Sequence, residues 1–287
     1  MTATIMRSTI AVLFLVVICI LPAGAAEKCD AVYGSGNNVF SLATGSPGEL
    51  GMLKVIGEAF AQTADARMCW LKAGSGDSMR MLKEKKVDMI MVHAPDAEKK
   101  AVADGWATKR YLIGSNEFFI VGPADDSAKI ADAKSASEAY QLIAAAKALF
   151  LSRGDNSGTH KKELDIWKRT GVQPSGSWYV ISKGFMTAVL RKANNEKGYF
   201  MTDSSTWTAE RKNVPALKIL FRGDQMLINT YHTLVQPPQA TQGADTAAKF
   251  ADYVISGAGQ RLIRDFGKDQ HGEGLYNDAA YAQQYDK

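Results

Sequence analysis

The chain has 287 residues, of which 46% are hydrophobic and 22% charged, and it contains no low-complexity tract. This composition is typical of a folded globular protein, and the length is ample for a large core or for two lobes of ordinary domain size. The formal net charge is +4. A balance this even speaks against a polyanionic partner, so we expect no nucleic acid.

The N-terminal segment predicts a signal peptide over residues 1–26. Arg7 supplies a positive charge, residues 10–21 form an apolar run of 12 residues, and the small residues of 22–26 offer a cleavage site. The run is short for a bilayer-spanning anchor, which is the alternative interpretation. We therefore expect a protein that is exported to the periplasm and loses this segment by cleavage.

Two cysteines remain after cleavage, Cys29 and Cys69. In an oxidising compartment such a pair favours a disulfide, which would tether the mature N-terminus to the strand around Trp70. Two buried thiols are the alternative. The four histidines are scattered and show no metal-ligand spacing, so we expect no metal and no cofactor.

Short apolar strands alternate with amphipathic helices through the first half of the mature chain. Strands are predicted over residues 39–43, 68–72, 87–92 and 118–122. Helices are predicted over residues 48–61, 77–85 and 97–104. The first of these helices places four apolar side chains on one face, namely Leu50, Leu53, Ile56 and Phe60.

The second half of the chain repeats the pattern. Strands are predicted over residues 148–152, 178–182, 198–202 and 233–236. Helices are predicted over residues 135–147, 157–170, 185–195, 246–255 and 257–266. This alternation predicts an α/β protein with mainly parallel sheets that helices cover on both faces.

Two α/β lobes with a cleft between them fit the length of the mature chain better than one open sheet. The apolar strands 118–122 and 233–236 are bounded by prolines, and we interpret them as crossings between the lobes. Lobe 1 would then be discontinuous and comprise residues 27–121 and 233–287. Lobe 2 would comprise residues 122–232.

Ligands of parallel α/β sheets bind beyond the carboxyl ends of strands, beside the N-termini of the following helices. Two early strand-to-helix turns, residues 43–48 and 73–78, place hydroxyl groups and glycines there. The candidate ligand-binding residues of these turns are Thr44, Gly45, Ser46, Ser75 and Gly76. The hydroxyls can donate and the glycines allow close approach of the backbone, while an ordinary turn is the alternative for each.

A third turn, residues 152–160, gives the strongest signal. It opens a helix whose first N–H groups carry partial positive charge and favour anions. Arg153 adds a planar set of donors that suits an oxyanion. Ser157 and Thr159 add hydroxyls, and Gly158 allows the backbone to approach. A surface turn with a solvated arginine is the alternative.

The same turn holds the residue types of a catalytic triad, namely Asp155, Ser157 and His160. Side chains crowded into one turn cannot line up as acid, nucleophile and base, so we assign Asp155 to orienting Arg153 or the turn amides. No nucleophile elbow, HExxH zinc motif or phosphate-loop lysine is present. We therefore expect a binding protein and no enzyme, with a periplasmic hydrolase that uses His160 as the alternative.

Four sequence blocks together resemble the tungstate-binding proteins of ABC transporters. The arginine block is SRGDNSGTHKKE at residues 152–163, followed by IWK at 166–168. The others are VHAPDAE at 92–98, NEF with IVGP between 116 and 123, and ANNEKG at 193–198. They occur in the order found in the family and cover nearly the whole mature chain.

This resemblance implies a type II periplasmic binding fold that holds a small oxyanion, such as tungstate or molybdate, in the cleft. Arg153, Ser157, Gly158 and Thr159 match the family's ligand-binding turn. The resemblance also implies an inner-membrane ABC permease and its ATPase as partners, with a sensor that signals to a membrane kinase as the alternative. We expect the binding protein itself to be a monomer.

Two segments depart from the family pattern. The family carries three threonines and a serine where this chain has Ala43-Thr44-Gly45-Ser46, and Phe185 stands in a turn where small residues are usual. Lys183 in the same turn would add positive charge beside the ligand. Because fewer hydroxyls and a bulky ring change the donors available, a small organic acid is the alternative ligand.

Overall fold

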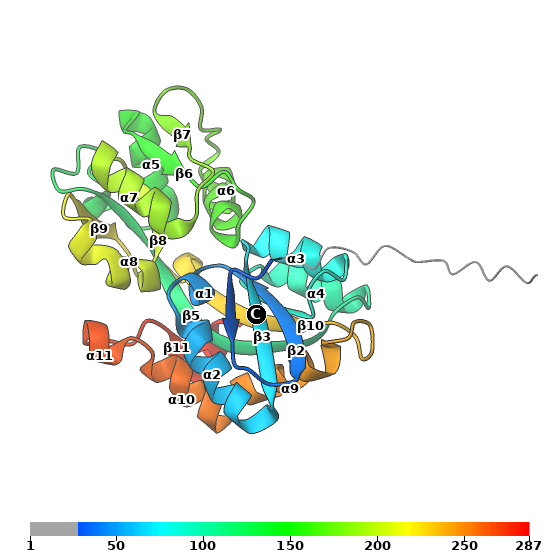
Figure 1. The fold of residues 1–287 in the computed structure, drawn as a ribbon. Helices are drawn as coiled ribbons and strands as arrows, with labels where there is room; N and C mark the ends of the chain where they lie inside the picture. Colours follow the sequence, from blue (N-terminus) through cyan, green and yellow to red (C-terminus); the bar gives the residue numbers. More distant parts are fainter. Residues whose placement is uncertain (1–27, 287) are drawn as a thin grey trace, which may run out of the picture.

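The computed structural model describes residues 28–286, so the predicted signal peptide lies outside the described residues. Two α/β lobes face each other and are joined by long strands (Figure 1). Within residues 28–286 no helix combines the length and the apolar character needed to cross a bilayer.

Lobe 1 contains a sheet with the strand order β1-β3-β2-β4-β10-β5-β11. β2 (Asn38–Thr44) pairs in parallel with β3 (Ala66–Lys72) and β4 (Met89–Val92). β1 (Ala31–Tyr33), β10 (Ile228–Val235) and β11 (Asn277–Asp278) pair antiparallel with their neighbours. Its helices are α1 (Ser46–Glu49), α2 (Met52–Ala64), α3 (Ser75–Lys83), α4 (Pro95–Ala103), α9 (Ala244–Ile255), α10 (Gly257–Asp265), α11 (Lys268–His271) and α12 (Ala279–Ala282), followed by the 3₁₀ turn Gln283–Tyr285.

Lobe 2 lies at the other end of the long strand β5 (Thr108–Pro123). There β8 (Phe200–Asp203) and β9 (Leu217–Phe221) pair antiparallel with β5, while β6 (Phe150–Ser152) and β7 (Tyr179–Ile181) pair in parallel with each other. Its helices are α5 (Ala136–Ala146), α6 (Gly158–Thr170), α7 (Met186–Glu196) and α8 (Ser204–Glu210), with 3₁₀ turns at Ile130–Asp132, Arg211–Asn213 and Gln225–Leu227.

Strand β5 joins the two lobes, because its first part pairs with β10 in lobe 1 and its last part with β8 and β9 in lobe 2. The predicted strand 118–122 is only the end of this element. The predicted lobe boundaries, after residues 121 and 232, fall inside β5 and β10. The two-lobed α/β fold is confirmed. Parallel pairing, which was predicted for most strands, occurs between strands that a helix connects, as in β2, β3 and β4 and in β6 and β7. Where the chain crosses between lobes and returns, neighbouring strands run in opposite directions.

The predicted helix 48–61 is divided into α1 and α2. Gly51 lies between them with φ at +92°, a left-handed conformation that interrupts a helix and that glycine adopts without strain. The apolar face predicted for this segment is buried on α2, where Leu53, Ile56 and Phe60 face the core. Helix α8 and strand β9 had no predicted counterpart.

Each lobe has its own hydrophobic core. In lobe 1 the rings of Phe60 and Phe250 pack with centroids 5.1 Å apart. In lobe 2 Tyr140 and Phe150 pack around Trp167, which is 2% exposed. Two separate cores allow each lobe to move as a unit about the strands that connect them.

Cys29 and Cys69 form a disulfide, as predicted. Cys29 precedes β1, which pairs with β3 so that Val32 lies opposite Cys69. The backbone N–H of Asp30 also donates to the carbonyl of Trp70. The backbone N–H of Lys72, the last residue of β3, also donates to Asp30 Oδ2 at 2.7 Å. The segment around Cys29 is therefore fastened to the edge of the lobe 1 sheet, near the cleft end of β3.

Candidate ligand-binding site

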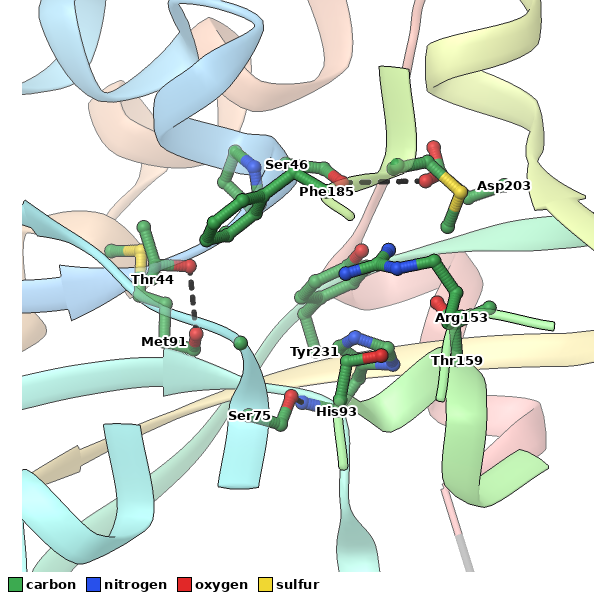
Figure 2. Close-up of a pocket in the computed structure, with 15 residues that line it drawn as sticks. Thr44, Ser46, Ser75, Met91, His93, Arg153, Thr159, Phe185, Asp203 and Tyr231 are labelled. Atoms are coloured by element: carbon green, nitrogen blue, oxygen red, sulfur yellow. Dashed lines mark hydrogen bonds between the residues drawn. The ribbon is translucent and has the colours of Figure 1, made fainter. Parts of the chain in front are cut away.

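Strands of both lobes end at the cleft, and the segments that follow them enclose a small cavity (Figure 2). The space open to the centre of a water molecule is about 20 Å³. The cavity is lined by Thr44, Gly45, Ser46, Pro47, Gly74, Ser75, Met91, His93, Arg153, Ser157, Thr159, Phe185, Met186, Asp203 and Tyr231. Such a volume suits a ligand of a few heavy atoms.

Lobe 1 contributes the residues that follow β2, β3 and β4. The Thr44 hydroxyl donates to the carbonyl of Met91 at 2.8 Å, so its proton is directed into the protein. The Ser46 hydroxyl donates across the cleft to Asp203 Oδ2 at 3.3 Å. The Ser75 hydroxyl accepts from the His93 backbone N–H at 3.3 Å and retains its own proton for a ligand.

Lobe 2 contributes Arg153, which follows β6 directly and is 4% exposed. Its Nε and Nη2 donate to Asp155 Oδ2, which holds one edge of the guanidinium in place. Figure 2 shows the guanidinium directed into the cavity. Burial would raise the pKa of Asp155, but the Arg153 charge and hydrogen bonds from Ser157 outweigh it, so the pKa is lowered and the carboxylate stays ionised.

Helix α6 begins at the same turn. Ser157 is its N-cap, and its hydroxyl accepts from the His160 N–H at 3.2 Å. The Ser157 hydroxyl is also hydrogen-bonded to the Asp155 carboxylate, and the remaining N–H groups of the first turn of α6 add partial positive charge. Helix α3 of lobe 1 also begins at the cleft, with Gly74 as its N-cap. Two helix N-termini thus meet the cavity from opposite lobes.

A buried glutamate holds the turn that contains Arg153 by accepting hydrogen bonds from it. Glu163 on α6 is 1% exposed and accepts from Ser152 Oγ at 3.0 Å and from Tyr179 Oη at 2.7 Å. It also accepts from the backbone N–H of Arg153. Burial raises the pKa of Glu163 to about 7, and these hydrogen bonds offset the effect only in part.

His93 and Tyr231 form the floor of the cavity, with ring centroids 4.9 Å apart. Burial lowers the pKa of His93 to about 4, and the positive charge of Arg153 contributes to the shift. The imidazole is therefore neutral at neutral pH. Burial raises the pKa of Tyr231, which stays protonated. The floor is polar but carries no formal charge.

Asp203 is the second carboxylate at the cavity. Burial raises its pKa, while hydrogen bonds from Thr206 and Ser46 work in the opposite direction. Its oxygens accept from the Thr206 N–H at 2.8 Å, the Thr206 hydroxyl at 3.0 Å and the Ser46 hydroxyl. The carboxylate is thus occupied by two donors of Thr206, whose helix α8 it caps, and by one donor from Ser46 across the cleft.

Seven of the predicted site residues line the cavity: Thr44, Gly45, Ser46, Ser75, Arg153, Ser157 and Thr159. Gly76, Gly158 and Lys183 do not line it. Lys183 is exposed and has φ at +52° in the turn before α7. The predicted set lacked His93 and Asp203. His93 directly follows β4 and Asp203 is the last residue of β8. The rule that ligands bind beyond the carboxyl ends of strands, which selected the predicted turns, could therefore have found both.

The candidate triad residues are engaged within their own turn. Ser157 N–H donates to Asp155 Oδ1 at 3.1 Å, and Asn156 N–H donates to His160 Nδ1 at 3.0 Å. The Ser157 hydroxyl caps α6 and is hydrogen-bonded to Asp155, while His160 Nδ1 is occupied by a backbone N–H. These contacts do not align the three side chains as nucleophile, base and acid. In residues 28–286 no three His, Cys, Asp or Glu side chains lie close enough to hold a metal ion.

Comparisons with known proteins cover both lobes and the cavity. The PBP superfamily domain matches residues 31–258. The tungstate-binding protein TupA of Peptoclostridium acidaminophilum is 30% identical over 259 residues, which are 89% of this chain and 89% of that protein. The solved structure titled as the tungstate ABC transporter from Geobacter sulfurreducens is 36% identical, with a TM-score of 0.72 over 81% of this chain and 100% of that chain. The tungstate-binding protein TupA of Desulfovibrio alaskensis G20 is 34% identical, with a TM-score of 0.69 over 84% and 98% of the two chains.

Proposed function

Because the chain belongs to the PBP superfamily and, within it, to the family of tungstate-binding proteins, we propose that it binds a small oxyanion of the tungstate type in its cleft. Arg153 carries this proposal. It is a buried arginine that lines the cavity and whose one edge is fixed by Asp155. The other edge of the guanidinium is left for a ligand, and planar donors of this kind bind oxyanions in defined geometry.

Most of the donors around the cavity are neutral hydroxyls and backbone N–H groups, which can hold an anion without neutralising all of its charge. The Ser75 hydroxyl retains a proton that it can donate, and α3 and α6 present their N-termini. Because water is largely excluded between the lobes, each of these dipoles interacts more strongly with a charge than it would in solvent. A compact anion with four oxygens could accept from several of them at once.

The size of the cavity supports an oxyanion over an organic acid. A volume near 20 Å³ leaves little space beyond one compact group, and Phe185 reduces the space further by placing its ring in the wall. A carboxylic acid with a longer carbon chain than acetate would have to displace this ring. The departures in the first loop and at Phe185 are therefore compatible with the tungstate type of ligand.

The test is a calorimetric titration of the ligand-stripped protein with tungstate, molybdate, sulfate, phosphate and acetate. We expect tight binding of one tetrahedral oxyanion and much weaker binding of acetate, which offers two oxygens instead of four to the donors around the cavity. Arg153→Ala should weaken that binding by roughly 100-fold, since a charge-assisted hydrogen bond contributes about 1.5–3 kcal/mol. The control is Arg169→Ala on α6, the helix that follows the Arg153 turn; this side chain is 61% exposed and paired with Asp165. Unchanged affinity in Arg153→Ala, or preference for acetate, would contradict the proposal.

The setting of the protein is part of the same proposal. One relative is named a tungstate-binding protein and one solved structure a tungstate ABC transporter, which supports delivery of the anion to an ABC permease. We propose that the chain does this as a monomer in the periplasm. Export predicts removal of residues 1–26. The mass of the protein recovered from the periplasm should then correspond to a chain that begins at Glu27, and a full-length product would contradict it.

A further inference from the structure

The first turns of α3 and α6 meet backbone to backbone across the cleft. A Cβ atom placed on Gly76 would lie 2.5 Å from the carbonyl oxygen of Asn156 and 2.6 Å from its side-chain nitrogen. Both distances are far below van der Waals contact. Gly76 is in lobe 1 and Asn156 in lobe 2, so only a glycine fits at this position while the lobes are in this arrangement.

Gly158 makes a second contact of the same kind in the opposite direction. A Cβ atom on Gly158, in lobe 2, would lie 2.2–2.6 Å from three atoms of the His93 ring in lobe 1. That ring has little freedom to move away. It packs against the Tyr231 ring at an angle of 41°, its side chain is hydrogen-bonded to Asn229, and its backbone N–H donates to Ser75.

Both glycines are restricted by the opposite lobe and not by their own. For each, the three nearest atoms to the added Cβ belong to one residue across the cleft. Neither has a positive φ, so the backbone of each is compatible with alanine. Gly76 lies in the first turn of α3 and Gly158 is the first residue of α6. Alanine there should leave a separated lobe unharmed or slightly stabilise its helix.

We propose that Gly76 and Gly158 are the residues that permit the lobes to close on the anion, an inference that rests on the proposed function. Neither lines the cavity, so their contribution to affinity is made through the distance between lobes and not through contact with the ligand. The same interface also contains attractive contacts, since Lys72 of lobe 1 lies 4.3 Å from the ring of Phe185 in lobe 2. A methyl group at either glycine would hold such contacts apart.

The chain offers a matched control in Gly257. It is the first residue of α10, as Gly158 is of α6, and the nearest atom to its added Cβ is an arginine nitrogen at an ordinary 3.7 Å. Gly76→Ala, Gly158→Ala and Gly257→Ala should therefore resemble one another in helix propensity. They differ in whether the new methyl group meets the other lobe.

Titration calorimetry with tungstate and small-angle scattering form the first test. We expect Gly76→Ala and Gly158→Ala to bind tungstate about 10-fold to 100-fold more weakly than the wild type, as overpacking a tight contact does. Both should lose the decrease in radius of gyration that tungstate causes. Their ligand-free melting temperatures should equal or exceed that of the wild type. Gly257→Ala should bind and compact as the wild type does.

A second measurement needs no ligand and so separates this inference from the proposed function. A Cβ on Gly74 would lie 3.2 Å from that of Ser157, near the separation of about 3.5–4.5 Å in a disulfide. The double variant Gly74→Cys, Ser157→Cys should cross-link across the cleft when the lobes close. Adding Gly158→Ala should slow this reaction, and adding Gly257→Ala should not.

The outcomes are distinct. Wild-type affinity in Gly158→Ala together with an unchanged cross-linking rate would overturn the inference. So would a clear fall in the ligand-free melting temperature of both glycine variants, because the glycines would then serve the fold of each lobe. Failure of the wild type to bind tungstate would contradict the proposed function, while the cross-linking rates would still decide the role of Gly158.

Discussion

Replacing Glu163 by glutamine should make the protein more stable at alkaline pH, although this carboxylate accepts hydrogen bonds from Ser152 and Tyr179. The reason is its burial, with 1% of the residue exposed beneath the Arg153 turn. Burial raises the pKa of Glu163 from an ordinary 4.5 to about 7. Glutamine has nearly the same shape, and it carries no charge at any pH.

The direction in which pH changes the unfolding free energy follows from proton binding by Glu163. The folded protein holds the Glu163 proton more tightly than the unfolded chain, so the stability that this proton provides is fully present below about pH 4.5 and is lost as the pH rises through about 7. The difference between the two pKa values, 4.5 and about 7, corresponds to about 3 kcal/mol of unfolding free energy by about pH 8. Glu163→Gln should recover about 1–3 kcal/mol of it there and be close to the wild type at about pH 4.

The assay is urea unfolding of both proteins between about pH 4 and pH 8, with the difference in unfolding free energy plotted against pH. The difference is needed because the lowered pKa of His93 gives the wild type an opposing slope. Glu196→Gln, at the exposed end of α7, is the control for the loss of a carboxylate at the surface. A difference that does not change with pH, or a Glu163→Gln protein less stable than the wild type at about pH 8, would refute the reasoning.

Three further predictions concern the cavity and the chain terminus. Because the pKa of His93 is about 4, the folded state loses stability as the pH falls below about 6.5, and urea unfolding of His93→Asn should lack this loss; an equal loss in the variant would contradict it. Phe185→Ala removes the ring beside Lys72 and widens the cavity, so titration calorimetry should show tungstate binding weakened roughly 3-fold to 10-fold and a longer carboxylate such as succinate newly bound; unchanged selectivity would argue against a role for the ring. Replacing Cys29 and Cys69 by serine opens a loop with a sequence separation of 40 and should cost about 2–4 kcal/mol in unfolding free energy without changing tungstate affinity; a loss of affinity would show that the disulfide influences the cleft.

Several features of the protein were predictable from the chain alone because they depend on neighbouring residues. The period of Leu53, Ile56 and Phe60 predicts a helix with one buried face, and α2 has that face. The sequence also predicts that Ser157 caps a helix and that Arg153 directly follows a strand, and the structure has both features. Such local preferences act over a few residues and can therefore be read in order along the sequence.

Other features were decided by segments that are far apart in the chain. The sequence around Gly76 and Gly158 suggested close approach to a ligand, whereas in the structure each glycine faces a residue of the other lobe. The hydroxyl of Ser46 suggested a donor to the anion, yet it donates to Asp203, 157 residues away. Neither partner can be found from local pattern, because the crossing of β5 between lobes determines which segments meet. The chain by itself thus determined the local chemistry of each turn, and only the tertiary structure decided whether that chemistry faces the ligand or the other lobe, since the distance between distant segments is set by the packing of the whole sheet.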